Sequence, residues 1–353
     1  MMKPVVRLAD VARAAGVSQG TASNAFNRPD IVRPELRAKV EAAALSLGYA
    51  GPDPKGRLLR AGKVHALGVV VNNSLGYFFN DPFNREFMRG VAAVCDAEGA
   101  GLSLIASHDQ KSAAWSIESA VVDGFILQCL EGGNRLVELA RKRRLPFVAV
   151  DLYPGTDAGS IIVDERGGAQ AAAEHLLGLG HRRFAILTLP LIDDGRTGPV
   201  DRSRRDATQY NTTRERLAGY AEALSAAGIA IDSVPIVESL NDRRAEEGAR
   251  MVLDAAPEAT AILAMSDVLA LAVLAEAVRR GRRVPQHLSV VGFDDVPEAA
   301  ASRPALTTVH QPIMEKGRIA AGMILSGATE RVALRTALAV RDSTAPPPET
   351  LRR

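Results

Sequence analysis

From Val64 onward the chain repeats one pattern, in which a short apolar run is followed by a segment with helical spacing of apolar residues. The runs are apolar throughout, which is typical of strands covered on both faces of a parallel sheet. We expect strands at Ala66–Val71, Leu102–Ala106, Val121–Leu127, Pro146–Val150, Ile161–Val163, Phe184–Leu189, Val234–Val237, Ala261–Ala264 and Leu288–Val291. Helices are expected between most of them, at about 83–98, 134–143, 166–179, 214–227, 243–255, 267–280 and 315–326. The pattern predicts an α/β body of two doubly wound lobes, which bind ligands at strand carboxyl ends or between lobes.

The first 50 residues instead have the pattern of three short helices. Apolar residues in 8–15 recur at the spacing of one helix face, and Gly16 ends that helix. Ser18 is a good N-cap for a second helix, and a third begins near Pro34. Two helices joined by a tight, glycine-containing turn are able to place the second in a DNA major groove. The alternative is an ordinary helical hairpin.

The charge distribution favours the DNA-binding interpretation. Residues 1–63 hold eleven Lys or Arg and five Asp or Glu, a net charge of +6, whereas the remaining residues have a net charge of −4. A basic head on an acidic body indicates a nucleic-acid partner, although many solvated N-terminal arms are also basic. Apolar residues make up 47% of the chain, too many for a disordered protein.

Several classes of protein are disfavoured. No run of about 18 apolar residues predicts a membrane span, and the N-terminus lacks the apolar region of a secretory signal. Two cysteines, Cys95 and Cys129, suit a reducing cytosol. No phosphate-binding glycine loop and no metal-ligand spacing is present, so we expect no cofactor and no metal. Residues 16–20 fit the letters of a hydrolase nucleophile elbow, but an elbow follows a strand and here a helix precedes it.

We expect four regions along the chain: a helix-turn-helix head at 1–50, a hinge at 51–63, a two-lobed body at 64–342 and a disordered tail at 343–353. Within the body, residues 190–213 form a polar insertion that we expect to be a mobile loop near the cleft.

A set of short motifs, which occur in the same order as in the family, resembles the lactose/galactose repressor family. In the head they are Leu8-Ala9-Asp10-Val11-Ala12, Ala15-Gly16-Val17-Ser18, Thr21-Ala22-Ser23 and Leu47-Gly48-Tyr49. In the body they are Glu174-His175-Leu176, Leu179-Gly180-His181, Arg216-Leu217-Ala218-Gly219-Tyr220, Ser289-Val290-Val291-Gly292-Phe293-Asp294-Asp295, Leu306-Thr307-Thr308-Val309 and Gln311-Pro312. The resemblance covers nearly the whole chain. It implies a small all-α helix-turn-helix head and a body similar to periplasmic sugar-binding proteins.

The resemblance also implies DNA-contacting positions. The second helix would enter the major groove, with Gln19, Gly20 and Asn24 where the family reads bases. Asn and Gln bond bidentately to adenine, whereas the Arg found at the position of Asn24 in many members prefers guanine. Ser18, Thr21, Ser23 and Asn27 suit phosphate contacts or local helix capping. In the hinge, Leu59 matches the leucine that family members wedge into the minor groove. Arg57, two residues earlier, is also expected to contact DNA.

For the body, strand ends and family positions together predict effector-binding residues. Arg216 and Asp294 match positions that touch small molecules in the family, and we expect them on opposite lobes of one cleft. Asp151 ends a strand, and the weaker candidates are Asp81, Phe83, Asp164 and Asp267. The alternative for Asp267 and Asp294 is helix capping and hydrogen bonding at the lobe hinge. Several carboxylates with one Arg suit a hydroxyl-rich ligand, either a sugar or a nucleoside.

We therefore expect a cytoplasmic, non-enzymatic transcriptional repressor that acts as a homodimer on a pseudo-palindromic operator and responds to a small polar effector. A periplasmic-type solute receptor and a hydrolase are the two alternatives. The first is opposed by the basic head and the second by the absence of a carboxylate pair in a recognisable motif.

Overall fold

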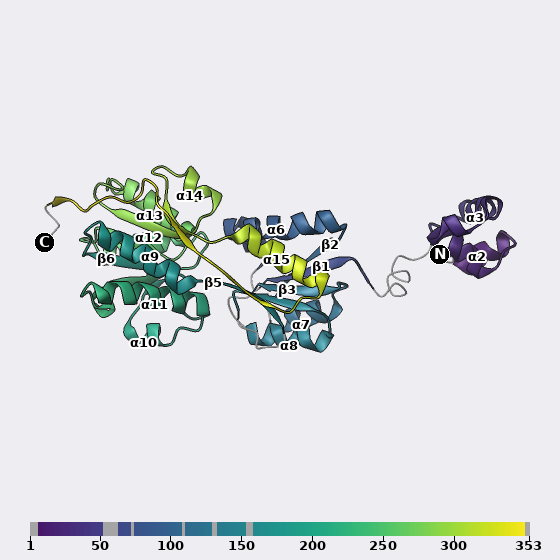
Figure 1. The fold of residues 1–353 in the computed structure, drawn as a ribbon, viewed down its shortest axis with the longest axis horizontal. Helices are drawn as coiled ribbons and strands as arrows, with labels where there is room; N and C mark the ends of the chain where they lie inside the picture. The colour runs from purple at the N-terminus through teal and green to yellow at the C-terminus, as the bar shows by residue number, and fades with distance from the viewer. Residues whose placement is uncertain are drawn as a thin grey trace, which may run out of the picture. The chain divides into compact units, whose positions relative to one another are not determined.

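The computed structural model describes residues 6–51, 63–71, 74–107, 110–128, 133–152 and 158–349. Contacts divide the chain into two compact units, residues 1–64 and residues 65–353. We describe them separately as the head and the body (Figure 1).

The head packs its helices around a small core of valine and alanine. Its elements are α1 (Leu8–Ala14), α2 (Gln19–Asn27), the 3-10 turn η1 (Pro29–Ile31) and α3 (Pro34–Leu47). The core residues are Val11, Ala12, Ala22, Ala25, Val40, Ala43 and Ala44. Small side chains here let the helix axes approach closely. Gly16 takes a φ of 65° between α1 and α2, a conformation that costs a glycine little, as the sequence pattern predicts.

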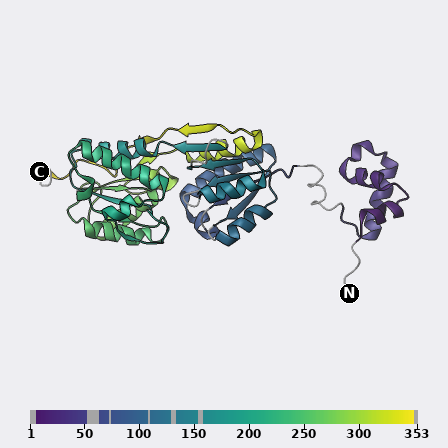
Figure 2. The same ribbon diagram turned by 90° about the horizontal axis from the view of Figure 1, so that it is seen from below.

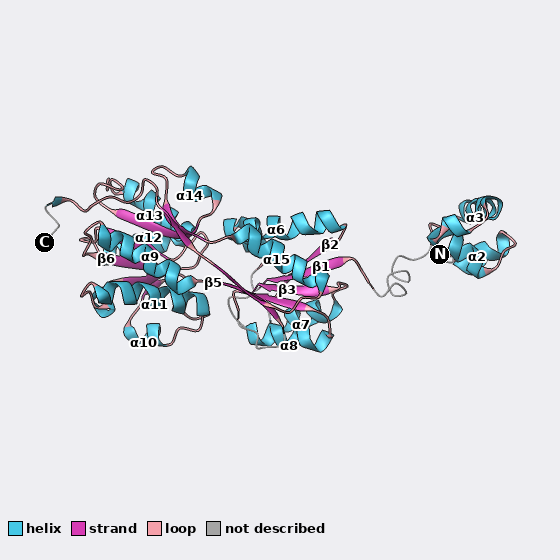
Figure 3. Cartoon of the chain, viewed as in Figure 1, coloured by secondary structure: helices cyan, strands magenta, loops and turns pink. Residues whose placement is uncertain are grey.

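The first lobe of the body is built on a parallel sheet with the strand order β12-β5-β4-β3-β1-β2. Its strands are β1 (Ala66–Val71), β2 (Gly101–Ala106), β3 (Gly124–Gln128), β4 (Phe147–Val150), β5 (Gly159–Val163) and β12 (Arg331–Leu334). Its helices are α5 (Leu75–Asn80), α6 (Pro82–Glu98), α7 (Gln110–Ser119), α8 (Gly133–Arg143) and α15 (Ile313–Ser326). Helices α6 and α15 pack on one face, with α7 and α8 on the other (Figure 3).

The second lobe has the strand order β13-β11-β10-β9-β6-β8-β7, parallel except for its two edge pairs. Its strands are β6 (Phe184–Thr188), β7 (Gly198–Pro199), β8 (Ile236–Glu238), β9 (Ala261–Ala264), β10 (Ser289–Asp294), β11 (Thr307–His310) and β13 (Ala337–Ala339). Its helices are α9 (Glu165–Gly178), α10 (Arg202–Asp206), α11 (Asn211–Ala226), α12 (Ala245–Ala255), α13 (Asp267–Arg279) and α14 (Pro297–Ala301), with a 3-10 turn η2 (Ile231–Ser233). Helices α9 and α11 pack together, as do α12 and α13.

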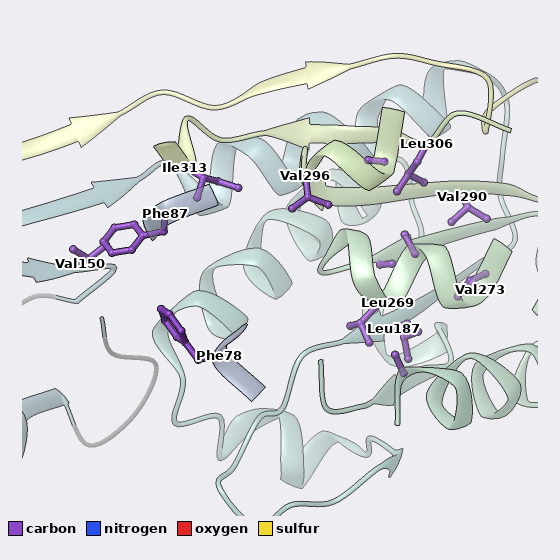
Figure 4. Packing of buried hydrophobic residues seen from close by; sticks show 14 of the residues in the cluster. Phe78, Phe87, Val150, Leu187, Leu269, Val273, Val290, Val296, Leu306 and Ile313 are labelled. Atoms are coloured by element: carbon purple, nitrogen blue, oxygen red, sulfur yellow. The ribbon is translucent and has the colours of Figure 1, made fainter. Parts of the chain in front are cut away.

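The chain passes between the lobes three times: after β5, between β11 and α15, and between β12 and β13. The last of these is the segment that runs from one lobe to the other in Figure 2. One core cluster contains residues of both lobes, including Phe87 and Val150 of the first and Leu269 and Val290 of the second (Figure 4). The two lobes are therefore joined by a hinge of three connections rather than by a single linker.

The prediction of a disordered tail is wrong for residues 343–349, the part of the tail that the structure describes. Ser343 is fully buried, and its Oγ accepts a hydrogen bond of 2.8 Å from the Thr307 N–H and donates one of 2.6 Å to the Val290 carbonyl. These bonds satisfy backbone groups of the second sheet, so the segment after Asp342 belongs to the lobe. Residues 350–353 lie outside the described residues.

The prediction of a mobile loop at 190–213 is also wrong, because the segment contains β7 and α10 and is held by ion pairs. Arg204 donates to both carboxylate oxygens of Asp194 at 2.9 Å and also pairs with Glu238, which is fully buried. The polar composition that suggests a loop is used for internal pairing. Among the elements not anticipated, α5 and α7 are short helices, and β12 and β13 are short strands at the edges of the two sheets.

Candidate functional site

A cavity of about 340 Å³ lies between the two lobes of the body. Residues from the first lobe that line it include Tyr77, Asp81, Phe83, Asn84, Gln128 and Asp151. Residues from the second lobe include Asp193, Thr212, Thr213, Arg216, Asn241, Asp242, Arg244, Ser266 and Asp294. Five of the seven predicted effector-binding residues are thus brought to one cavity: Asp81, Phe83, Asp151, Arg216 and Asp294.

Arg216 and Asp294 are not on opposite lobes, and that expectation is wrong. Both belong to the second lobe, where Arg216 Nη2 lies 3.5 Å from Asp294 Oδ1. The Arg216 Nε also donates to Glu165 Oε2 at 2.6 Å, and its guanidinium lies over the Phe293 ring, 3.6 Å from the centroid. The sequence argument assigned them to strands from the two halves of the body, but α11 and β10 belong to the same lobe, where helix α9 packs against both.

The carboxylates of this network are costly to bury. Burial raises the pKa of Asp294 to about 7 although Arg216 opposes the shift, and burial likewise raises the pKa of Glu165. Asp294 has a φ of 118°, and its Oδ1 accepts a bond of 2.6 Å from Gln311 Nε2. Holding a non-glycine residue there stores backbone strain, which is common where a side chain is aimed at a functional site.

Lys316 lies at the hinge and joins the two lobes through polar contacts. Its Nζ donates to both oxygens of Asp151 at 2.8 Å and to Gln311 Oε1 at 2.8 Å. The lysine is fully buried, and its Nζ lies 5.3 Å from the centroid of the Phe83 ring. Because Gln311 also bonds to Asp294, the chain of contacts runs from Asp151 in the first lobe to Arg216 in the second.

Asp81 stands on the first lobe at the start of α6, where its Oδ1 accepts a bond of 3.2 Å from the Phe83 N–H. Burial, and then the charge of Asp294, raise its pKa to about 7. Asp81 and Asp294 are therefore two carboxyl groups that influence one another across the cavity.

Asp164 and Asp267 do not line this cavity. Asp164 caps α9 by accepting a bond of 2.9 Å from the Gly167 N–H. Asp267 is fully buried and accepts bonds from the Val296 N–H and the Thr308 hydroxyl, tying α13 to the ends of β10 and β11. The geometry supports the alternative named for Asp267, that of a structural hydrogen-bonding residue.

Sequence reasoning missed Glu165, Lys316 and Gln311. Glu165 and Lys316 sit in helices, where a charged residue ordinarily faces solvent, and nothing in their local spacing indicates burial. Gln311 lies inside a family motif at the end of β11, which was a usable signal. Tyr77 was also missed; it lines the cavity, as does Asn241 of the second lobe, and burial raises its pKa.

In the head, α2 carries the predicted DNA-contacting residues. Ser18 Oγ caps the helix by accepting a bond of 3.0 Å from the Thr21 N–H, and Asn27 Nδ2 donates to Ser23 Oγ at 3.2 Å. Gln19 and Gly20 are exposed. The local-capping role expected for Ser18 is therefore present, and Asn24 lies six residues beyond this cap on α2, about 1.7 helical turns. Arg57 and Leu59 lie outside the described residues.

No described helix is long and apolar enough to span a membrane. Within the same residues, no group of three or more His, Cys, Asp or Glu is placed to hold a metal ion.

The head and the body together define a class: a helix-turn-helix unit joined to a two-lobed ligand-binding fold. Residues 7–51 match the model of bacterial regulatory proteins of the lacI family, and residues 173–344 match a periplasmic binding protein-like domain. The chain is 40% identical to an HTH-type transcriptional regulator of Mycobacterium tuberculosis over 97% of both chains. It therefore belongs to the LacI family of transcriptional regulators, which bind DNA.

Solved structures agree with this assignment. The structure of the lac repressor dimer bound to operator aligns with a TM-score of 0.73 at 25% identity, over 97% of this chain and 100% of that one. A complex of the regulator CelR with cellobiose aligns with a TM-score of 0.68 at 29% identity, over 96% of this chain and 99% of that one.

Proposed function

We propose that this protein is a transcriptional repressor whose operator affinity is set by a hydroxyl-rich small molecule bound between the two lobes. The observation that carries the proposal is the cavity of about 340 Å³, lined by polar groups of both lobes. A ligand that bonds to both walls favours one lobe arrangement over another, and this is the differential affinity that ligand control requires.

A sugar or a nucleoside fits the cavity by its chemistry. Carboxylates such as Asp81 and Asp294 accept hydrogen bonds from adjacent hydroxyls, and aromatic side chains such as Phe83 supply an apolar surface for a sugar ring. The CelR structure, in which a protein of the same fold holds cellobiose, supports a carbohydrate.

On the DNA side, the proposal assigns base reading to Gln19, Gly20 and Asn24, with Ser18, Thr21, Ser23 and Asn27 near the phosphates. Two copies of the chain read a pseudo-palindromic operator, as the dimeric state of the lac repressor structure supports. We place the protein in the cytoplasm and assign it no catalytic activity. Ser18, the only residue at a nucleophile-like motif, follows helix α1 and acts as a helix cap.

The first experiment is a fluorescence anisotropy titration of the full-length protein on DNA from upstream of its own gene. The logarithm of the binding constant should fall linearly with the logarithm of the salt concentration, with a slope of about −0.9 for each phosphate neutralised. The same titration with added sugars and nucleosides should identify a compound that changes operator affinity by about 5- to 150-fold. A compound that binds the body and leaves operator affinity unchanged would refute ligand control.

A second experiment tests base reading by Asn24. Asn24→Arg should change the preferred base at one half-site position, each wrong base costing roughly 1–3 kcal/mol, when selected on a randomised operator library. Ser46→Arg is the matched control, because Ser46 is exposed on α3 and the change adds the same charge to the head. Identical preferences for Asn24→Arg and wild type would place Asn24 away from the bases.

A further inference from the structure

The charges that line the cavity are predominantly negative. Its described lining holds two guanidinium groups, of Arg216 and Arg244, and six carboxylates. The carboxylates belong to Asp81, Asp151, Glu165, Asp193, Asp242 and Asp294. The electrostatic potential inside such a cavity favours cations and disfavours anions, because low-dielectric walls focus the field of the lining charges.

Both guanidinium groups already have carboxylate partners. Arg216 is bonded to Glu165 and to the Met265 carbonyl, lies beside Asp294 and stacks on a phenylalanine ring. Arg244 donates from Nη2 to Asp242 at 2.8 Å and from Nε to the same carboxylate at 3.1 Å. Neither is placed to offer the open, two-pronged fork with which arginine recognises a phosphate or a carboxylate.

The buried ammonium group is committed in the same way. Lys316 Nζ has three protons to donate, and the structure gives it three acceptors within 2.8 Å, two on Asp151 and one on Gln311. An anionic ligand would have to displace Asp151 in order to gain this cation.

Two of the polar groups that line the cavity offer hydrogen-bond acceptors that the described residues leave open. Asp81 is only 8% exposed, and the described residues supply one backbone hydrogen bond to its Oδ1 and no salt bridge. Gln128 donates its Nε2 to Asn84 at 2.7 Å, while its Oε1 is buried and has no hydrogen-bond partner among the described residues. A buried acceptor without a donor is costly, so Gln128 Oε1 favours a ligand that brings donors, and the Asp81 carboxylate beside the same cavity has room to accept from them.

We infer that the cavity takes an uncharged or amine-bearing polyhydroxyl compound and rejects its phosphate ester or carboxylic acid, and that Asp81 determines this selectivity. The inference rests on the proposed function and adds the charge class of the ligand. Hydroxyl and ammonium groups donate to Asp81 and Gln128 Oε1, whereas the oxygens of a phosphate or carboxylate are themselves acceptors and cannot bond to these two groups. At the short distances inside a cavity, and with little screening from salt, one added anion is enough to change affinity by about tenfold or more.

The test compares matched compounds on the full-length protein by calorimetric titration at pH 8, above the pKa of about 7 that burial gives Asp81. The panel pairs neutral sugars and nucleosides with their esters, for example ribose with ribose 5-phosphate, glucose with glucose 6-phosphate, and adenosine with its monophosphate, and it includes glucosamine and cellobiose. The neutral or amine-bearing member should bind at least about tenfold more tightly than the ester. Tighter or equal binding of an ester would overturn the inference.

The assignment to Asp81 is tested by Asp81→Asn, which removes the charge and keeps a residue favoured at helix N-caps. The ratio between the affinities for the neutral compound and its ester should fall by about tenfold. Asp96→Asn is the matched control, since Asp96 is exposed at the other end of the same helix. An unchanged ratio in Asp81→Asn would refute the role of Asp81. These titrations measure binding without DNA, so they can fail while the anisotropy test of ligand control succeeds, and the reverse also holds.

Discussion

Arg216→Ala should destabilise the second lobe severely, because it removes the cation that two buried carboxylates share. Arg216 is 3% exposed, bonds to Glu165 at 2.6 Å and lies 3.5 Å from Asp294. Breaking a buried ion pair from one side costs about 3–5 kcal/mol, since the remaining charge loses its partner without regaining water. The loss of contact with the Phe293 ring adds to this cost.

The measurement is thermal and urea unfolding of wild type and variant at pH 8. At about 2 °C for each kcal/mol in a domain of this size, the melting temperature should fall by about 6–10 °C. Arg214→Ala is the control, because Arg214 lies on the same helix with its side chain about half exposed, and it should change stability by less than about 0.5 kcal/mol.

The loss of unfolding free energy in Arg216→Ala should depend on pH in one direction. Burial already raises the pKa of Glu165 and Asp294 in the folded wild type, and losing Arg216 raises them further. A carboxyl whose folded pKa is raised binds its proton more tightly in the native state, so acid favours the native state relative to the unfolded one. The deficit should therefore shrink between pH 8 and pH 5. A loss below about 1 kcal/mol at pH 8, or a deficit that grows in acid, would refute the ion-network argument.

Three further predictions concern the ligand and the lobes. Ligand affinity should rise with pH through about 7 and level off above it. The reason is that ligand hydroxyls stabilise the Asp81 carboxylate, whose pKa is about 7, so binding in acid must expel its proton. A flat affinity profile in titrations from pH 6 to 8 would contradict this. Gly90→Ala should lower the melting temperature, since a Cβ there overlaps a backbone carbonyl of α15, while Gly322→Ala, with open space around it, should not; equal melting temperatures would show that the helices simply move apart. Arg85→Gln breaks the salt bridge to Glu298 that joins α6 of one lobe to α14 of the other, and it should weaken ligand binding by at most about fivefold, an effect that disappears in high salt; a loss that persists in high salt would need another cause.

The part of the site that could be predicted comes from strand ends and family positions. Asp151 and Asp294 follow apolar runs, and in a parallel sheet such ends gather at one edge, so their presence in the cavity was foreseeable. Asp164 and Asp267 satisfy the same rule and yet serve as a helix cap and an interior hydrogen-bonding group. The rule locates the edge of a sheet, but it does not say whether a carboxylate there turns toward the cleft or toward the nearest helix terminus.

The sequence by itself determined the head, the alternation of strands and helices, and the family, because each depends on residues a few positions apart along the chain. Helical period, a capping serine and a glycine at positive φ act locally, and the structure retains them at α1, α2 and Gly16. Only the tertiary structure decided that Arg216 and Asp294 share a lobe, that Lys316 lies buried at the hinge, and that Ser343 hydrogen-bonds to the second sheet. These are encounters between residues distant in sequence, and they follow from the order in which strands pair and from the cost of burying an unpartnered charge or backbone group, which no local pattern records.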